Sequence, residues 1–260
     1  MTKSLPTLLL LLLAATLIGQ DIKIGFQDSI ESKVLEETRR LFISLPNDYY
    51  NSDHSYPVIY QLDGDPDLFI ETAGVIQRLT YREEILPEVI VVLIENTNRN
   101  RDMMPTNTGF FENEPGAENF KKFIEDELFL HMSNSYRVSG ERTLIGQSLS
   151  SIFALYCYLT APDMFDFYIA SSAGFLDCED YFINLTNEML VRKRSKKQKV
   201  FLSHGAKDQL DPQGLIEKQL LNFTQLIGSD NLTEFKYIKY EEEGHVPFQS
   251  VYHGLKYFYE

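Results

Sequence analysis

The chain has 260 residues, 43% of them apolar, which is enough for one larger domain with a substantial core. Its formal net charge is −14, and so acidic a surface repels phosphate backbones, which argues against nucleic-acid partners. The cysteines and histidines show no zinc-ligand spacing, so we expect no metal and no organic cofactor.

Residues 1–20 have the layout of a secretory signal peptide. Lys3 supplies a short positive region, an apolar stretch runs from Leu8 to Ile18, and Ala14, Ala15 and Gly19 offer small residues for cleavage. The stretch is short for a membrane span, and no later segment is long and uncharged enough to be one. The sequence predicts an exported protein, periplasmic or extracellular, with residues 21–260 as the folded domain; an uncleaved anchor is the alternative.

Short β-type segments then alternate with helical ones. The segment 88–96 is apolar on both faces, as expected of a central parallel strand. This alternation predicts an α/β fold with a largely parallel sheet covered on both faces by helices. The expected strands are 38–46, 56–64, 88–96, 142–148, 165–174, 199–205 and 234–245, and the expected helices are 116–136, 150–162, 212–228 and 247–260.

Cys157 and Cys178 have two interpretations. Export would permit a disulfide between them. Cys157, however, lies in an apolar helical run, so a buried free thiol is an equally good interpretation.

Ser148 stands where an expected strand meets an expected helix. Small residues two positions before and after it, Gly146 and Ser150, permit a tight turn of the nucleophile-elbow type, G-x-S-x-G, with serine in the last place. The helix that starts behind the serine offers free N–H groups and its positive end to a developing oxyanion. The pattern favours Ser148 as a nucleophile; an ordinary helix N-cap is the alternative.

A nucleophilic serine needs a base and a carboxylate that orients the base. His245 stands at the end of the last expected strand, 234–245, and Asp208 lies in the loop after the strand before it, which gives the chain order serine, acid, histidine. Asp211 is the second choice of acid, although the proline after it suggests a helix start. His204 is expected to be structural or to line a pocket, and His253 to lie on the face of the closing helix.

The oxyanion would be bound by two backbone N–H groups. One comes from Leu149, directly after the serine, and the other from Asp65 in the loop after the strand 56–64, with Gly64 as the alternative. The long polar loop 95–116 follows a central strand, where ligands bind in sheets of this kind.

Four blocks of sequence, taken in order, resemble one known family. They read PVIYQLDG (57–64), NRNRDMMPT (98–106), LIGQSLSSIFALY (144–156) and EEEGHVPFQSVYHGLKYF (241–258). Together they are similar to the esterases of the α/β-hydrolase superfamily that include esterase D, the enterochelin and salmochelin esterases and, more distantly, the mycolyltransferases. The sequence departs from the family in having Ser150–Ser151 in place of Gly-Gly, and SSAGF (171–175) in place of a segment with Ser-Pro.

The resemblance implies that Ser148 is the nucleophile, His245 the base, and the N–H groups of Leu149 and Asp65 the oxyanion donors. It also places Arg101 in a segment that lines the rim of the cleft. There Arg101 would either steer an acidic or phenolic substrate or pair with Asp102.

The expected reaction is hydrolysis of a carboxylic ester, on a small molecule or a sugar, through an acyl-enzyme intermediate. Phe175 and Tyr181 are candidates for binding its acyl or aryl group, with buried packing as the alternative. Acyl transfer to a sugar or alcohol, and a non-catalytic binding protein on the same fold, are the competing interpretations. The ester, the oligomeric state and glycosylation at the Asn-x-Thr sites stay open.

Overall fold

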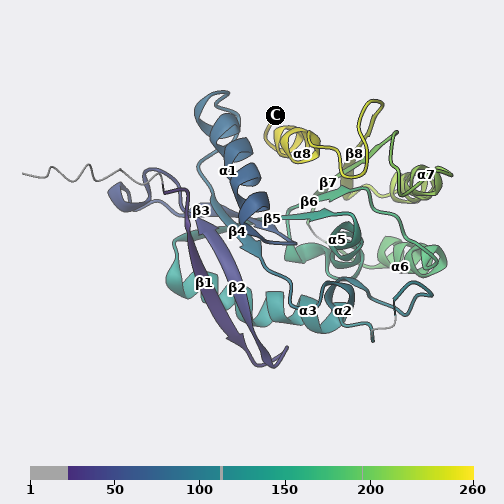
Figure 1. Ribbon diagram of the computed structural model, residues 1–260, viewed down its shortest axis with the longest axis horizontal. Coiled ribbons are helices and arrows are strands. Elements are labelled where there is room, and N and C mark those ends of the chain that lie inside the picture. Colours follow the sequence, from purple (N-terminus) through teal and green to yellow (C-terminus); the bar gives the residue numbers. More distant parts are fainter. Residues whose placement is uncertain (1–22, 112–113, 195) are drawn as a thin grey trace, which may run out of the picture.

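The computed structural model describes residues 23–111, 114–194 and 196–260, which form an eight-stranded sheet with helices on both faces (Figure 1). The strand order is β1-β2-β4-β3-β5-β6-β7-β8. The first two pairings are antiparallel, and every pairing from β4 to β8 is parallel. The strands are β1 (Phe26–Ser32), β2 (Glu37–Ser44), β3 (Tyr56–Gln61), β4 (Ile90–Ile94), β5 (Val138–Gln147), β6 (Phe167–Ser171), β7 (Gln198–Gly205) and β8 (Thr233–Tyr240).

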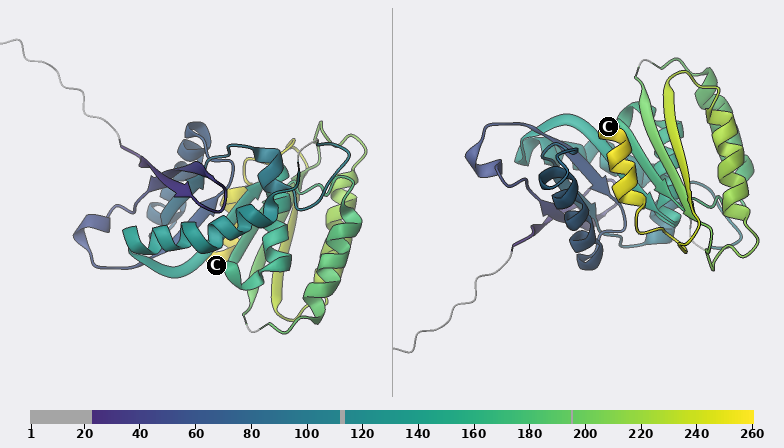
Figure 2. Two further views of the ribbon diagram at one scale, coloured as in Figure 1. Left: turned by 90° about the horizontal axis from the view of Figure 1, so that it is seen from below. Right: turned by 90° about the horizontal axis from the view of Figure 1, so that it is seen from above.

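Helices cover the two faces unequally. The two views of Figure 2 show α1 and α8 together on one face and the helices α3 to α6 on the other. The helix α7 packs against α6 and against the strands β7 and β8. The helices are α1 (Pro66–Tyr81), α2 (Arg99–Met103), α3 (Ala117–Phe123), α4 (Phe129–Ser135), α5 (Leu149–Thr160), α6 (Glu179–Val191), α7 (Leu215–Ile227) and α8 (Ser250–Tyr259).

The central strand β4 and the helix α5 are buried to the extent that their apolar sequences predict. Every residue of β4 is buried, as its uninterrupted apolar run requires of a strand covered on both faces. In α5 every residue except Thr160 is buried, which matches an apolar helix with no polar face. The predicted largely parallel α/β architecture is confirmed.

The strand β1 and the helices α1, α2 and α6 are not among the elements expected from the sequence, and α2 lies within the expected polar loop 95–116. The edge strand β1 is mostly polar and alternates less exposed with exposed residues, and it is held by antiparallel pairing with β2. The helix α1 begins at a proline after the capping residue Asp65, and α6 buries only Phe182, Thr186 and Met189. The expected helix 116–136 is interrupted by a π-helical turn at Ile124–Leu128, between α3 and α4.

Two further expectations concern the cysteines and the N-terminus. Cys157 and Cys178 are both buried free thiols, so the disulfide interpretation is wrong. The expected signal peptide, 1–20, lies outside the described residues. Within the described ranges, no helix combines the length and the apolar character needed to cross a membrane.

Candidate active site

Ser148 occupies a strained backbone position between β5 and α5. Its φ is 56° and its ψ −124°, a conformation that costs on the order of 1–3 kcal/mol and persists only when the surroundings enforce it. The turn is so tight that a Cβ on Gly146 would lie 2.3 Å from the carbonyl oxygen of Ser150. The N–H of Ser148 donates to the carbonyl of Ser171, which fixes the turn to the neighbouring strand at 2.8 Å.

The two serines that replace the family's glycines are part of this turn. The hydroxyl of Ser150 accepts a hydrogen bond from the N–H of Gln147 at 2.8 Å and donates one to the Gln147 carbonyl at 2.8 Å. The hydroxyl of Ser151 donates to the carbonyl of Ser148. Both side chains are fully buried, so the departure from Gly-Gly adds hydrogen bonds to the turn without blocking it.

The side chains of Ser148, His245 and Asp208 form a continuous chain of contacts. The Ser148 Oγ lies 2.7 Å from Nε2 of His245, and Nδ1 of His245 lies 2.6 Å from Oδ2 of Asp208. The other oxygen of Asp208 accepts the N–H of Leu210 at 2.8 Å. A carboxylate at Nδ1 favours the tautomer with the proton there, which leaves the Nε2 lone pair facing the hydroxyl.

The second candidate acid, Asp211, has a different contact. Its carboxylate accepts the N–H groups of Leu215 and Ile216 at 2.7 Å each, so it caps the start of α7. The geometry therefore distinguishes the two carboxylates: Asp208 contacts the histidine, and Asp211 holds a helix.

The loop that carries His245 is attached to the loop after β7. A Cβ on Gly205 would lie 2.0 Å from the carbonyl oxygen of Gly244, so only glycine permits this approach. The N–H of Lys207 donates to the carbonyl of Glu243 at 2.9 Å. On the other side of the histidine, the N–H of Val246 donates to the hydroxyl of Ser172 at 3.2 Å.

The structure narrows the choice of oxyanion donor in the loop after β3. The N–H of Gly64 already donates to the carbonyl of Ile94 at 2.8 Å, so it is not free to bind a ligand. The carboxylate of Asp65 caps α1 by accepting two backbone N–H groups. Among the described residues, no acceptor pairs with the N–H of Asp65 or with that of Leu149.

Ser148 and His245 open onto a cavity of about 440 Å³, within the usual size for small-molecule sites. Its walls are largely apolar, and they come from the loop after α2, the start of α5, the segment after β6 and the start of α7. The apolar side chains are those of Phe110, Phe111, Leu149, Ile152, Leu176, Leu210, Leu215 and Ile216, and the acidic and basic side chains are those of Arg99, Asp177, Asp211 and His245.

Arg99 lines this cavity, whereas the expected residue Arg101 does not. The Arg99 guanidinium binds the carboxylate of Asp63 in a bidentate pair at 2.7 Å, and it also reaches the Gln147 carbonyl at 3.2 Å. The Arg101 guanidinium pairs with Asp102 at 2.7 Å and with Glu37 at 2.9 Å. Of the two roles expected for Arg101, the structure shows the pairing with Asp102.

Phe175 and Tyr181 also lie outside the cavity lining. Phe175 is 1% exposed and stacks on Phe182, with ring centroids 4.5 Å apart. Tyr181 packs edge-on against the same ring. The expectation that these two side chains face the substrate is corrected, because both are used to pack α6; Phe110 and Phe111 are the aromatic residues of the cavity wall.

His204, which is buried, and His253, which is partly buried, both have tyrosine partners. His204 lies 2.8 Å from the hydroxyl of Tyr237, and His253 lies 2.8 Å from that of Tyr240. Burial lowers the pKa of both imidazoles, which favours their neutral forms. Neither histidine lines the cavity at Ser148.

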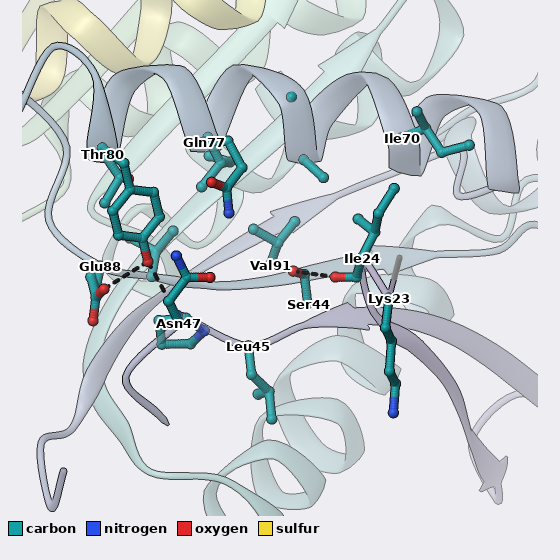
Figure 3. A pocket seen from close by; sticks show the side chains of 16 residues that line it. Lys23, Ile24, Ser44, Leu45, Asn47, Ile70, Gln77, Thr80, Glu88 and Val91 are labelled. Atoms are coloured by element: carbon teal, nitrogen blue, oxygen red, sulfur yellow. Dashed lines mark hydrogen bonds between the residues drawn. The ribbon is translucent and has the colours of Figure 1, made fainter. Parts of the chain in front are cut away.

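A second cavity, of about 420 Å³, lies between α1 and the end of β2 (Figure 3). The hydroxyl of Ser44 there donates to the carbonyl of Ile24, and the hydroxyl of Tyr81 bridges Asn47 and Glu88. Neither histidine nor cysteine occurs among the described residues that line this cavity. Its described lining residues therefore include no serine paired with a histidine.

The sheet order, the serine at the turn after β5 and the carboxylate and imidazole after β7 and β8 define an α/β-hydrolase. Residues 32–249 match the family described as "Putative esterase", and the chain belongs to this family. It is therefore a carboxylic ester hydrolase, and the sequence-based recognition of its family is confirmed.

Three similar proteins illustrate the relationship. The ferri-bacillibactin esterase BesA of Bacillus subtilis is 26% identical, over 90% of this chain and 86% of its own length. The crystal structure of an IroE-like serine hydrolase from Shewanella oneidensis has a TM-score of 0.81 and 29% identity, covering 90% of this chain and 80% of the other. The siderophore hydrolase EstB from Aspergillus nidulans has a TM-score of 0.79 at 20% identity, covering 93% and 96%, which shows the shared fold.

Proposed function

We propose that the protein is an exported serine esterase that hydrolyses siderophore-type esters through an acyl-enzyme intermediate. The observation that supports this most strongly is the pair of short contacts from Ser148 through His245 to Asp208. Support for the substrate class comes from the relatives, one described as a ferri-bacillibactin esterase and one as a siderophore hydrolase. The proposed export rests on the signal-like residues 1–20.

In the first half of the reaction, Nε2 of His245 removes the Ser148 hydroxyl proton while Oγ attacks the ester carbonyl. The carbonyl oxygen becomes negative in the tetrahedral intermediate. The C–O bond to the alcohol then breaks, the imidazolium gives its proton to the leaving alkoxide, and the acyl group remains on Ser148. Asp208 holds the imidazole in the required tautomer and stabilises its positive form.

In the second half, a water molecule takes the place of the alcohol. His245 removes a proton from this water as its oxygen attacks the acyl carbon, and the proton then passes to Ser148 as the acid leaves. The proposed oxyanion donors in both halves are the N–H groups of Leu149 and Asp65. Each such donor contributes a factor of about 10² to 10³ in rate.

The test is hydrolysis of 4-nitrophenyl esters of increasing chain length by the wild type, Ser148→Ala and Ser44→Ala. Ser44 is the matched control, because its hydroxyl lines the second cavity. We expect Ser148→Ala to lose a factor of about 10⁴ to 10⁶ in kcat and Ser44→Ala to retain wild-type rates. Equal rates in the wild type and Ser148→Ala would contradict the proposal.

Product analysis then addresses the substrate and the competing reaction. Incubation with iron-free and iron-loaded siderophore esters should yield their acid fragments in a manner that depends on Ser148. Adding a sugar or simple alcohol as acceptor distinguishes hydrolysis from acyl transfer, because transfer gives a new ester in place of the free acid. A predominance of the new ester would assign the protein to the acyltransferases.

A further inference from the structure

The cavity at Ser148 lacks a free positive charge among its described lining residues. Its only lysine or arginine is Arg99, and the bidentate contact with Asp63 balances that charge. An anionic substrate would therefore find no unpaired cation in the described lining.

Two carboxylates of the cavity, by contrast, have no lysine or arginine partner among the described residues. Asp177 lies in the exposed turn before α6, and its Oδ2 accepts the N–H of Gly109 at 2.7 Å. Asp211 is bound to the backbone N–H groups at the start of α7. In the described part of the chain, no lysine or arginine forms a salt bridge with either. Asp208 lies behind His245, and the whole chain carries a net charge of −14. These charges together make the electrostatic potential in the cavity negative.

The rim of the same cavity carries exposed apolar side chains. Phe110, Leu210 and Leu215 are 66%, 74% and 53% exposed, and all three line the opening. Single exposed apolar residues are common on protein surfaces, but several around one opening indicate a contact surface for an apolar ligand. This rim suits a substrate that extends beyond the cavity.

We propose that the site selects uncharged or cationic esters with a bulky apolar portion, rejects anionic ones, and uses Asp177 as a specificity-determining residue. The inference rests on the proposed esterase function and adds the charge class of its substrate. Among siderophore esters, it favours those without net negative charge. A negative charge on the substrate, placed near one solvent-exposed carboxylate of the protein, reduces the affinity for that substrate by a factor of about 10 at low ionic strength.

Three chromogenic esters of similar length test this proposal at low ionic strength. They are mono-4-nitrophenyl adipate, which is anionic; its methyl ester, which is neutral; and 4-nitrophenyl 5-(trimethylammonio)pentanoate, which is cationic. We expect the wild type to show a kcat/KM at least about 10-fold lower for the anionic ester than for the neutral one, with the cationic ester at or above the neutral one. Salt at 0.5 M should reduce these differences.

The variant Asp177→Asn removes one charge and keeps an oxygen to accept the Gly109 N–H. We expect it to reduce the neutral-to-anionic ratio of kcat/KM by about 3-fold or more. Asp53→Asn, which removes the same charge at an exposed position outside the cavity lining, should keep the wild-type ratio. This control separates a local effect of Asp177 from a change in overall net charge.

The outcomes distinguish the two proposals. Ser148-dependent turnover with no preference between the anionic and neutral esters would overturn the charge inference and leave the esterase proposal intact. An unchanged ratio in Asp177→Asn would overturn the role of Asp177. Turnover that is the same in the wild type and Ser148→Ala would overturn the esterase proposal, and the charge inference with it.

Discussion

The Nε2 atom of His245 lies 2.7 Å from the Oγ atom of Ser148, although the two residues are 97 positions apart in the chain. The contact depends on parallel strands, because β5 and β8 both end at the same edge of the sheet. The strained turn at Ser148 brings the hydroxyl to this edge, and the loop after β8 brings the imidazole. Several consequences can be measured.

Removing the charge of Asp208 should disable the histidine. We expect Asp208→Asn to lower kcat by about 10⁴, because an amide no longer enforces the tautomer with the proton on Nδ1. The comparison is Asp211→Ala, which should lower the free energy of unfolding by about 1 kcal/mol through the loss of a helix cap. Steady-state rates with a 4-nitrophenyl ester and urea denaturation measure the two effects. A larger loss of kcat in Asp211→Ala would reverse the assignment.

Arg99 should matter for rate and Arg101 for stability. Arg99 connects the loop after β3, through Asp63, to the Gln147 carbonyl beside Ser148, so Arg99→Ala should loosen both proposed oxyanion donors. We expect kcat to fall by about 10² while KM changes little. Arg101→Ala should lose about 1 kcal/mol or less of stability and keep the wild-type kcat. A similar decrease in kcat in Arg99→Ala and Arg101→Ala would contradict the different roles assigned to the two arginines.

Gly146→Ala tests the tightness of the turn. The added methyl would lie 2.3 Å from the Ser150 carbonyl oxygen, so we expect a clearly lower Tm and loss of esterase activity. Gly74→Ala is the matched control, because its Cβ would meet no atom within 4 Å and it lies inside α1. That change should raise stability by about 0.5–1 kcal/mol. A Gly146→Ala protein with wild-type Tm and activity would show that the turn can accommodate a Cβ atom at this position.

Asp230 should contribute to acid unfolding. Burial raises its pKa, but hydrogen bonds from Thr233, Arg194 and the Leu232 N–H outweigh burial, so the net pKa lies below the ordinary value. A carboxylate whose pKa is depressed on folding stabilises the protein above the pKa of the unfolded chain. That contribution is lost as the pH falls through the pKa of the folded state.

The variant Asp230→Asn should therefore be less stable than the wild type at pH 7, and this difference should shrink as the pH falls toward 3. Urea denaturation across that range measures it. If the free energy of unfolding falls equally in the wild type and Asp230→Asn as the pH is lowered, Asp230 does not contribute to the pH dependence.

The sequence predicts the elements that have strong local signals. Ser148 could be recognised because an apolar strand, small neighbours and an apolar helix surround it within a few residues. His245 and Asp208 follow from the order of the strands, since each lies just past one. The contact between His245 and Asp208, and the helix-capping role of Asp211, needed the structure, because the two competing carboxylates are only three positions apart in the chain.

The cavity wall could not be predicted in this way. Arg99 and Arg101 stand two positions apart in the short helix α2, where neighbours at that spacing point in different directions. Phe175 seemed suited to ligand binding, but its packing on Phe182 depends on where α6 lies. The helix α6 was not expected because a sequence with few buried positions gives only a weak periodic signal.

Covalent labelling with a fluorophosphonate, followed by peptide mass spectrometry, tests most directly whether His245 activates Ser148. We expect one adduct, on the peptide that contains Ser148, and labelling at least about 10³-fold slower in His245→Ala. Labelling at the wild-type rate in His245→Ala, or an adduct on another residue with Ser148 unmodified, would contradict the account.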